Sequence, residues 1–513
     1  MQQVKYGLKT KIVLLILIFF AVSLCDAVVF SAPKKSKSVS VSSNKKKKEI
    51  ISKNKSSNKS QYSKKEITSK NKSFQKSKYS KSAKKKRKPK IYVRKVALNE
   101  ISILETKKLA EGVEYKKVQF GKDPLKIIAH LVEADFDSTQ NKVCVLKARN
   151  NVTGLDYLKN IYDDYHFELT RIYEGDLLAL VNANFWSAYL NYPIGLLISD
   201  GEVISMKKYK EWSSVLFDKE NRPYIDNFEL FGEIIFPNKE RIEIDNVNKR
   251  TENDNVVVYN KYFGDSLPKI YVRDLEKMVE QTIKNMTLGQ NDLDTFEIEI
   301  DTNQVRNQIL KELQYESKEY STIKYAFQYL EKPIINERVK VKLLQIDTGV
   351  VAIPSDGFVL SLPLDFKRSR WKVGDVAELF FYTNKLRYIE FENGVSGTPR
   401  LVRKGVARHE AYQEGSRGYR FIGAQLPRTC LGTNMSKTKL YLIYVETSRS
   451  SGSLGANLTQ LATIAKKLGC YDAVNLDGGG SSSMVINGEK VAGNGNSNGR
   501  KISVAIGVLK NSK

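Results

Sequence analysis

Cysteine, histidine and tryptophan are scarce in this chain. Its 513 residues include 4 Cys, 3 His and 3 Trp. Beyond the N-terminal segment the cysteines are Cys144, Cys430 and Cys470, and an odd number cannot form a complete disulfide framework. Cys430 and Cys470 both lie in apolar surroundings, so we expect buried free thiols, with a bridge between them as the alternative.

The three histidines, His130, His166 and His409, do not have metal-ligand spacing. This spacing argues against a His-rich zinc site, and we expect neither a metal nor another cofactor. Long apolar runs are also missing after the first thirty residues. The sequence therefore predicts no later segment that spans a bilayer.

The N-terminus has the features of a secretory signal. Three lysines among the first eleven residues precede an apolar run over residues 12–24, and small residues follow at Ala27 and Ala32. This run reaches about 20 Å as a helix, short of the roughly 30 Å hydrocarbon core of a bilayer. We predict a signal peptide over residues 1–32 and a secreted, periplasmic or cell-envelope protein. An uncleaved signal that anchors the chain in the membrane is the alternative.

Residues 33–95 consist mostly of lysine and serine and are expected to form a disordered arm, because they lack the apolar side chains of a core. Residues 33–90 carry +21 and the signal region +2 of the net charge of +27, which leaves only +4 for residues 91–513. A nearly balanced body does not favour nucleic acid as a partner. We expect the arm to contact anionic envelope polymer or a membrane surface. A solvated spacer without a partner is the alternative.

For the remainder, residues 96–513, we predict one β-rich domain. Apolar runs and turn signals predict strands at 125–134, 143–148, 176–182, 194–199, 440–446, 470–476 and 484–486. An Asp-Gly pair after residue 199 indicates a hairpin. Helices are predicted at 156–167, 273–285 and 303–331, and a further one of about thirteen residues ends at Gly469. This order predicts a mixed α/β (α+β) fold, with a central sheet, packed helices and a helical insertion at about 268–335.

One loop in the C-terminal third has a marked polar pattern. It follows a predicted strand and reads, from residue 475, NLDGGGSSS. Consecutive glycines permit positive φ and a close approach to a ligand, and successive N–H groups can converge on an anionic oxygen. Ser481 and Ser482 add hydroxyl donors, and Asp477 lies at the edge of the loop. A tight turn in which Asp477 bonds its own backbone is the alternative.

Two other segments place an arginine where an anion could bind. Glu446 ends a predicted strand, and Arg449 lies before a predicted helix whose first N–H groups attract anions. Arg428 follows a proline and offers the two-pronged donor that suits phosphate or carboxylate. Helix capping and a surface ion pair are the respective alternatives.

Six ordered segments resemble the phosphodiester glycosidase family, which is similar to the enzyme that uncovers mannose 6-phosphate by removing N-acetylglucosamine. The segments are NLDGGGSS at 475–482, PRTCLG at 427–432, the strand and helix start at 440–458, NGR at 498–500, NANF at 182–185 and VSGTPRLVRKG at 395–405. They cover about residues 112–510 apart from the helical insertion. Glu446 stands where the family usually has Asp, and Ala183 and Asn184 replace two glycines.

The resemblance implies hydrolysis of a glycosidic bond whose leaving group is a phosphodiester, in a glycan or sugar-phosphate substrate. It implies Asp477 as the carboxylate nearest the sugar C1, with Glu446 as its partner for water activation or protonation. The groups expected to hold the phosphate are Arg428, Arg449, Arg500, Gly478, Gly479, Gly480, Ser481 and Ser482. Asn182 and Asn475 are expected to bind sugar hydroxyls. The rival functions are a catalytically silent, envelope glycan-binding protein and a hydrolase of phosphomonoesters.

Overall fold

Strands dominate the structure, a computed structural model that describes residues 92–137, 140–172, 175–269, 274–290, 300–366, 371–491 and 499–510. All of these residues belong to one compact unit, Lys86–Lys513. The expected signal peptide and nearly all of the expected arm lie outside the described residues. The domain boundaries therefore stay predictions, while the mixed α/β expectation needs adjustment, because β structure outweighs the helices.

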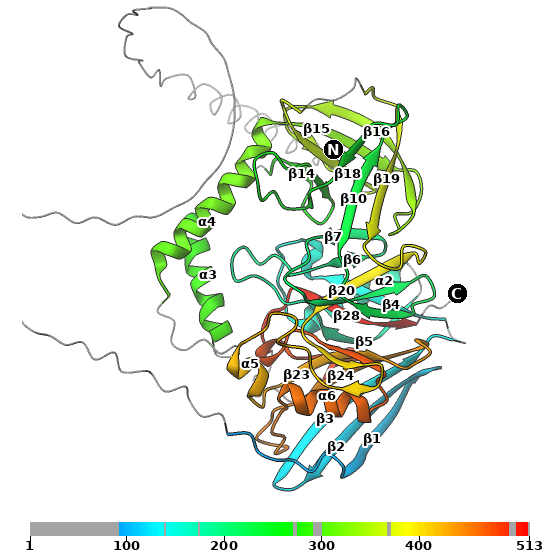
Figure 1. The fold of residues 1–513 in the computed structure, drawn as a ribbon, viewed down its shortest axis with the longest axis vertical. Helices are drawn as coiled ribbons and strands as arrows, with labels where there is room; N and C mark the ends of the chain where they lie inside the picture. The colour runs from blue at the N-terminus through cyan, green and yellow to red at the C-terminus, as the bar shows by residue number, and fades with distance from the viewer. Residues whose placement is uncertain are drawn as a thin grey trace, which may run out of the picture. The chain divides into compact units, whose positions relative to one another are not determined.

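An eight-stranded sheet carries most of the motifs, and we call it the site sheet (Figure 1). Every neighbouring pair in it is antiparallel. Its order is β1 (Ile101–Ala110), β2 (Val113–Lys122), β3 (Leu125–Asp135), β24 (Lys439–Val445), β23 (Arg428–Thr433), β25 (Asp472–Asn475), β21 (Arg400–Arg403) and β22 (Val406–Ala407). The central strands are buried on both faces, which explains their nearly continuous apolar sequences.

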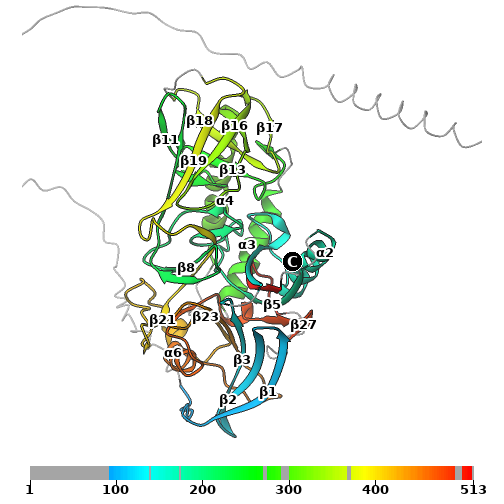
Figure 2. The same cartoon turned by 90° about the vertical axis from the view of Figure 1, so that its right-hand side faces the viewer.

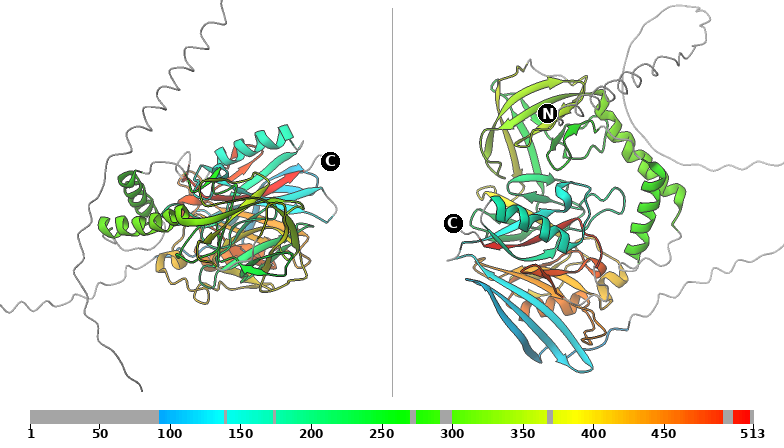
Figure 3. Two further views of the ribbon diagram at one scale, coloured as in Figure 1. Left: turned by 90° about the horizontal axis from the view of Figure 1, so that it is seen from above. Right: turned by 180° about the vertical axis from the view of Figure 1, so that it is seen from behind.

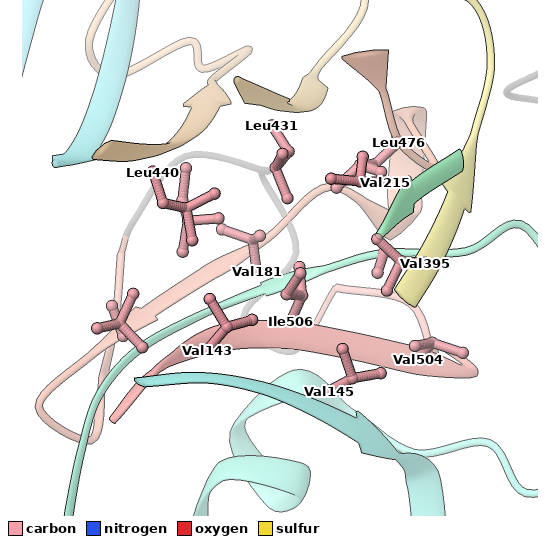
Figure 4. Packing of buried hydrophobic residues seen from close by; sticks show 14 of the residues in the cluster. Val143, Val145, Val181, Val215, Val395, Leu431, Leu440, Leu476, Val504 and Ile506 are labelled. Carbon is pink, nitrogen blue, oxygen red and sulfur yellow. The ribbon is translucent and has the colours of Figure 1, made fainter. Parts of the chain in front are cut away.

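A five-stranded sheet, which we call the facing sheet, packs against one face of the site sheet. Its order is β27 (Glu489–Lys490), β26 (Met484–Ile486), β5 (Asp176–Asn182), β28 (Val504–Lys510) and β4 (Asn141–Lys147). Leu431 and Leu440 of the site sheet point toward Val181 and Ile506 of the facing sheet, and all four are fully buried (Figure 4). The predicted strand at 176–182 is confirmed at both ends.

Helix α6 (Leu458–Lys467) covers the other face of the site sheet, where Leu461 and Ala465 pack in one cluster with Cys430 and Ile443. A capping box between Asn457 and Gln460 begins the helix. Gly469 follows it with φ of +105°, a conformation that favours glycine. The predicted end of this helix is therefore confirmed.

Three further sheets complete the described strands. A second five-stranded sheet has the order β7 (Glu202–Ser205), β6 (Leu197–Ser199), β20 (Phe391–Gly397), β8 (Ser213–Asp218) and β9 (Pro223–Asp226). A second eight-stranded sheet has the order β11 (Arg241–Glu243), β10 (Leu230–Ile235), β19 (Val376–Thr383), β16 (Arg338–Asp347), β15 (Thr322–Tyr329), β18 (Gly357–Pro363), β13 (Val257–Asn260) and β12 (Asn246–Val247). A short pair joins β14 (Ser266–Leu267) and β17 (Val351–Ala352).

The predicted single central sheet is therefore wrong, because the described strands form five sheets. The predicted hairpin is confirmed: Asp200 and Gly201 join β6 to β7 with φ of +50° and +82°. These positive values match the twist of a two-residue hairpin turn.

The remaining helices are α2 (Leu158–Ile172), α3 (Leu275–Gln290), α4 (Thr302–Ser317) and α5 (Tyr419–Gly423). Helices α3 and α4 lie side by side in the predicted insertion (Figure 3). The predicted helix at 303–331 is too long, because α4 ends at Ser317 and β15 begins at Thr322. Antiparallel pairing of β15 with β16 and β18 decides the structure there. None of the helices in the described ranges is long and apolar enough to cross a membrane.

Candidate active site

Three motif residues lie at one end of the site sheet. Strands β24 and β25 both run antiparallel to β23, which lies between them, so their C-terminal ends flank the start of β23. Glu446 directly follows β24, Asp477 lies two residues beyond β25, and Arg428 begins β23. With about 4.8 Å between neighbouring strands, the backbones at Glu446 and Asp477 are about 10 Å apart.

The glycine-serine loop, residues 478–482, is held by backbone contacts on both sides. The N–H of Gly479 donates to the carbonyl of Pro427 at 2.9 Å. The N–H of Arg500 donates to the carbonyl of Gly480 at 3.2 Å. Gly479 has φ of +61°, so this turn requires glycine's freedom from a side chain. Segments about fifty and twenty residues away in the sequence thus fix the loop.

Asp477 is buried, with 8% of its surface exposed. Its carbonyl accepts a 2.6 Å hydrogen bond from Asn182 Nδ2, and its N–H donates to the carbonyl of Ala183 at 2.9 Å. Its Oδ1 accepts from the N–H of Gly478 at 2.9 Å. The bond to the loop's own backbone, which was the alternative interpretation of this motif, is therefore present, and it fixes the carboxylate at the edge of the loop.

Asn182 and Asn475 are completely buried and hold backbone segments in place. Oδ1 of Asn182 accepts from Thr429 Oγ1 at 2.7 Å and from the N–H of Ser483 at 3.1 Å. Nδ2 of Asn475 donates to the carbonyl of Thr398 at 2.7 Å. These bonds join β5, β23 and the glycine-serine loop. Contact of either asparagine with sugar hydroxyls stays a prediction.

Two buried polar atoms next to the loop have no hydrogen-bond partner within the described part of the chain. They are Oγ of Ser481 and Oδ1 of Asn475. Both residues have no exposed surface, and Ser482 is buried beside them. Buried polar atoms are nearly always hydrogen-bonded in proteins. These two atoms can therefore serve a ligand or a water molecule.

Arg428 is buried beside the loop and donates to backbone carbonyl groups. Nε contacts the carbonyl of Ala456 at 3.0 Å, and Nη2 contacts those of Phe421 at 2.7 Å and Ala424 at 3.2 Å. A Cβ added at Gly478 would lie 3.7 Å from Nη1. The guanidinium thus lies next to the loop while it fixes the segment from α5 to α6.

The other two predicted arginines differ in position. Arg500 is half-buried, and its guanidinium lies 5.0 Å from the centre of the Trp186 ring, close enough for a cation–π contact. Arg449 is exposed in the turn after β24. Its neighbours Ser448 and Ser450 line a cavity next to Glu446. The structure therefore brings Arg428 and Arg500 to the loop and leaves Arg449 on the surface.

Glu446 is buried, with 2% exposure, and both of its carboxylate oxygens are engaged. Oε2 lies 2.9 Å from His130 Nε2, and Oε1 accepts from the hydroxyl of Ser451. Burial alone raises the pKa of a carboxyl group, but the hydrogen bonds from His130 and Ser451 outweigh this effect and lower the pKa of Glu446. Glu446 is therefore an anion at neutral pH.

A cavity of about 360 Å³ opens beside Glu446, between the site sheet and β26 and β27 of the facing sheet. These elements can be followed in Figure 2, where β1, β2 and β3 run side by side. The cavity is lined by Glu105, Lys107, Tyr115, Lys117, His130, Glu446, Ser448, Ser450, Ser451, Ile486, Glu489, Lys490 and Val491. Both charge signs are represented among these lining residues.

His130 and Tyr115 are site residues that the sequence did not single out. His130 was considered only as a metal ligand, although a histidine inside the apolar strand at 125–134 is itself a signal. Tyr115 lies on β2, which pairs with β3, the strand that carries His130. The sequence alone does not show that these two residues are neighbours. The buried free thiols expected at Cys430 and Cys470 are confirmed. In the ranges that the structure describes, three or more His, Cys, Asp or Glu side chains do not gather as a metal site would require.

Comparison with known families decides which chemistry the site resembles. Residues 346–509 match the phosphodiester glycosidase family. The predicted resemblance to phosphodiester glycosidases is thus confirmed. The matched segment contains Arg428, Glu446, Asp477 and Arg500, whereas His130 precedes it.

One solved structure shows the same kind of fold. A hypothetical protein from Synechocystis is 17% identical with a TM-score of 0.53, and the alignment covers 80% of this chain and 64% of that protein. The chain therefore spans less than two thirds of that protein's length. The catalytic domain of zebrafish N-acetylglucosamine-1-phosphodiester alpha-N-acetylglucosaminidase is 12% identical with a TM-score of 0.36, over 80% of this chain and 87% of that domain. The comparison with curated proteins gives no match.

Proposed function

We propose that this protein is an exported phosphodiester glycosidase that hydrolyses a sugar-1-phosphodiester bond in envelope or extracellular glycans. The observation that carries the proposal is the position of two buried acidic residues, Glu446 and Asp477, which follow strands that end at the same edge of the site sheet. Arg428 begins β23, the strand between them, and next to Asp477 lies a loop of glycine and serine residues. All of these groups fall within the matched family segment.

The proposed reaction assigns a task to each part of this edge. The sugar C1 gains positive charge as the bond breaks, so a carboxylate must stabilise or attack it. We assign this task to Asp477 and the activation of water to Glu446. The departing phosphate is already a good leaving group and mainly needs cations and N–H donors. Arg500 and residues 478–482 are proposed to supply them, while Arg428 holds the loop in place, and Asn182 and Asn475 are proposed to lie nearest the sugar hydroxyls.

Export is proposed from the N-terminal sequence, with its basic start, short apolar run and small residues. The lysine-rich arm is proposed to contact anionic envelope polymer or the membrane surface through salt-sensitive attraction. The measurement is fractionation of the native cells at increasing salt, followed by N-terminal sequencing of the recovered protein. A mature chain that begins at Met1 in the cytosolic fraction would contradict export.

The activity is tested by product analysis. Purified protein is incubated with UDP-sugars, synthetic sugar-1-phosphodiesters and wall or capsule fragments, and free sugar, phosphomonoester and inorganic phosphate are quantified. Free sugar is the expected product, whereas inorganic phosphate alone indicates a phosphomonoesterase. As a matched control, Asp477→Asn is expected to lower the rate at least ~100-fold, the usual scale for loss of a catalytic group, with an unchanged melting temperature.

A catalytically silent glycan-binding protein is the second candidate, and the NANF segment favours it. Asn184 occupies one of the two usual glycine positions and is buried. Its Nδ2 donates to the carbonyls of Ile194 at 3.2 Å and Leu196 at 3.0 Å. This side chain therefore takes space that glycine would leave open. Saturable binding of a sugar-1-phosphodiester without any product over long incubation would support this candidate.

A further inference from the structure

We propose that His130 and Tyr115 are positioning residues that hold Glu446 as the water-activating base of the hydrolysis. This inference rests on the proposed function and refines it, because the family resemblance left the tasks of the two carboxylates open. The observation behind it is a hydrogen-bonded chain from Tyr115 through His130 to Glu446, at the wall of the cavity next to the site sheet.

The chain of contacts crosses three neighbouring strands on one face of the site sheet. Tyr115 is on β2, His130 is on β3, and Glu446 follows β24. The hydroxyl of Tyr115 lies 2.9 Å from Nδ1 of His130, and Nε2 of His130 lies 2.9 Å from Oε2 of Glu446. The ring of Tyr444 stacks on the imidazole, with centroids 5.5 Å apart and planes 21° apart. Packing thus fixes the plane of the imidazole.

Hydrogen-bond chemistry sets the direction of each bond. An ionised carboxylate only accepts, so Nε2 of His130 must carry the hydrogen that points at Glu446. In the neutral ring Nδ1 is then an acceptor, and the hydroxyl of Tyr115 donates to it. Ser451 donates to the other oxygen of Glu446. Each carboxylate oxygen of Glu446 keeps a second lone pair that can accept a hydrogen bond. Water in the cavity can reach the carboxylate, because Glu446 lines the cavity.

The catalytic step balances without any further reactant. Glu446 takes one proton from a water molecule in the cavity as the water oxygen forms a bond to the sugar C1. The C1–O bond to the phosphate breaks, and its electron pair leaves with the phosphate oxygen, which gives a phosphomonoester and a free sugar. Glu446 then returns its proton to solvent. His130 keeps its hydrogen throughout and supplies orientation rather than a proton.

Other charged and titratable groups face Glu446 from the surrounding strands. They are Glu105 and Lys107 of β1, Lys117 of β2, Tyr444 of β24, and Glu489 and Lys490 of β27. Lys117 also lowers the pKa of Glu446, and burial raises the pKa of Tyr444. Since the bond from His130 lowers the pKa of Glu446, its removal must raise that pKa. The base form is then present only at higher pH.

The hydrogen-bonded chain is tested first without reference to activity. The protein has only 3 His, so selective 15N-histidine labelling gives few imidazole signals, which single His→Gln substitutions assign. The ring of His130 is expected to carry hydrogen on Nε2, the nitrogen that faces Glu446, and Tyr115→Phe is expected to shift its Nδ1 signal. A ring without hydrogen on Nε2, or an Nδ1 signal that Tyr115→Phe leaves in place, overturns the proposal.

The role in catalysis is tested by the pH dependence of kcat/KM for sugar release. In His130→Leu the acidic limb is expected to move to higher pH by about one unit, the scale of one hydrogen bond to a charged group. Its KM should stay within about twofold of wild type, and His130→Gln, which keeps an N–H donor, should restore part of the shift. His166→Gln, on α2 and outside the cavity, is the matched control and should match wild type.

The outcomes separate this inference from the proposed function. In one outcome, wild type releases sugar but the acidic limb of the pH profile does not move in His130→Leu. In another, Glu446→Gln keeps its activity. Either outcome shows that the assignment of Glu446 as base is wrong, while the glycosidase activity stands. If wild type releases no sugar from any diester, the proposed function fails and the base role fails with it. The imidazole signals then still report whether Tyr115, His130 and Glu446 are joined by hydrogen bonds.

Discussion

Arg428 gives the sharpest test of how the arginines act, because the structure engages its donors with protein atoms rather than leaving them for phosphate. The perturbation is Arg428→Met, which keeps much of the length of the side chain and removes every donor. Arg428 is 1% exposed and donates to the carbonyls of Ala456, Phe421 and Ala424. The substitution leaves these three carbonyls without this partner.

The expected loss follows from these three bonds. A net contribution of about 1 kcal/mol for each hydrogen bond gives a decrease of about 3 kcal/mol in the free energy of unfolding. The neighbouring loop should also loosen, because a Cβ at Gly478 would lie only 3.7 Å from the guanidinium. We therefore expect Arg428→Met to reduce both stability and sugar release.

The assay is urea unfolding followed by tryptophan fluorescence, with rates measured on the same samples. The matched control is Arg449→Met, because Arg449 is exposed and its loss should change stability by no more than about 0.5 kcal/mol. If Arg428→Met keeps nearly full stability and still abolishes sugar release, Arg428 acts on the substrate directly and the structural reasoning is refuted.

Two further predictions concern the loop and the thiols. Gly479→Ala is expected to cost about 1 kcal/mol or more of stability, because Gly479 has φ of +61°. Gly478→Ala, at φ of −121° and with neighbours no closer than 3.6 Å, should cost clearly less, and equal losses in urea unfolding would refute the backbone argument. Burial raises the pKa of Cys144 to about 12 and raises the pKa values of Cys430 and Cys470 as well, so these thiols should react with a disulfide reagent at pH 8 only after unfolding. Rapid labelling of the folded protein would contradict this burial.

Local sequence predicted many elements well. The run at 176–182 matches β5, the Asp-Gly pair forms the predicted hairpin, and Gly469 ends α6 as expected. These features depend on side-chain burial and backbone φ within a few residues. The helix predicted through residue 331 failed because β15 gains its structure from β16 and β18, which lie elsewhere in the sequence.

The residues of the candidate site also fall into two groups, those found from local sequence and those found only from the structure. The glycine-serine loop, Asp477 and Glu446 were found from motifs, because close backbone approach and carboxylate chemistry need those residue types at those places. The contacts of His130 with Tyr115 and Glu446 join residues 15 and 316 positions apart. Strand pairing alone makes those neighbours, so no local pattern could reveal them.

The amino-acid sequence by itself determined the family resemblance, the glycine loop and the separation of a lysine-rich arm from a nearly balanced body. These properties are local, or they are sums over composition, so they need no knowledge of which strands pair. Only the tertiary structure decided that the ends of β23, β24 and β25 share one edge, that Arg428 faces backbone carbonyls, and that a histidine bonds Glu446. Those facts depend on hydrogen bonding and burial between distant segments, which exist only once the sheets have formed.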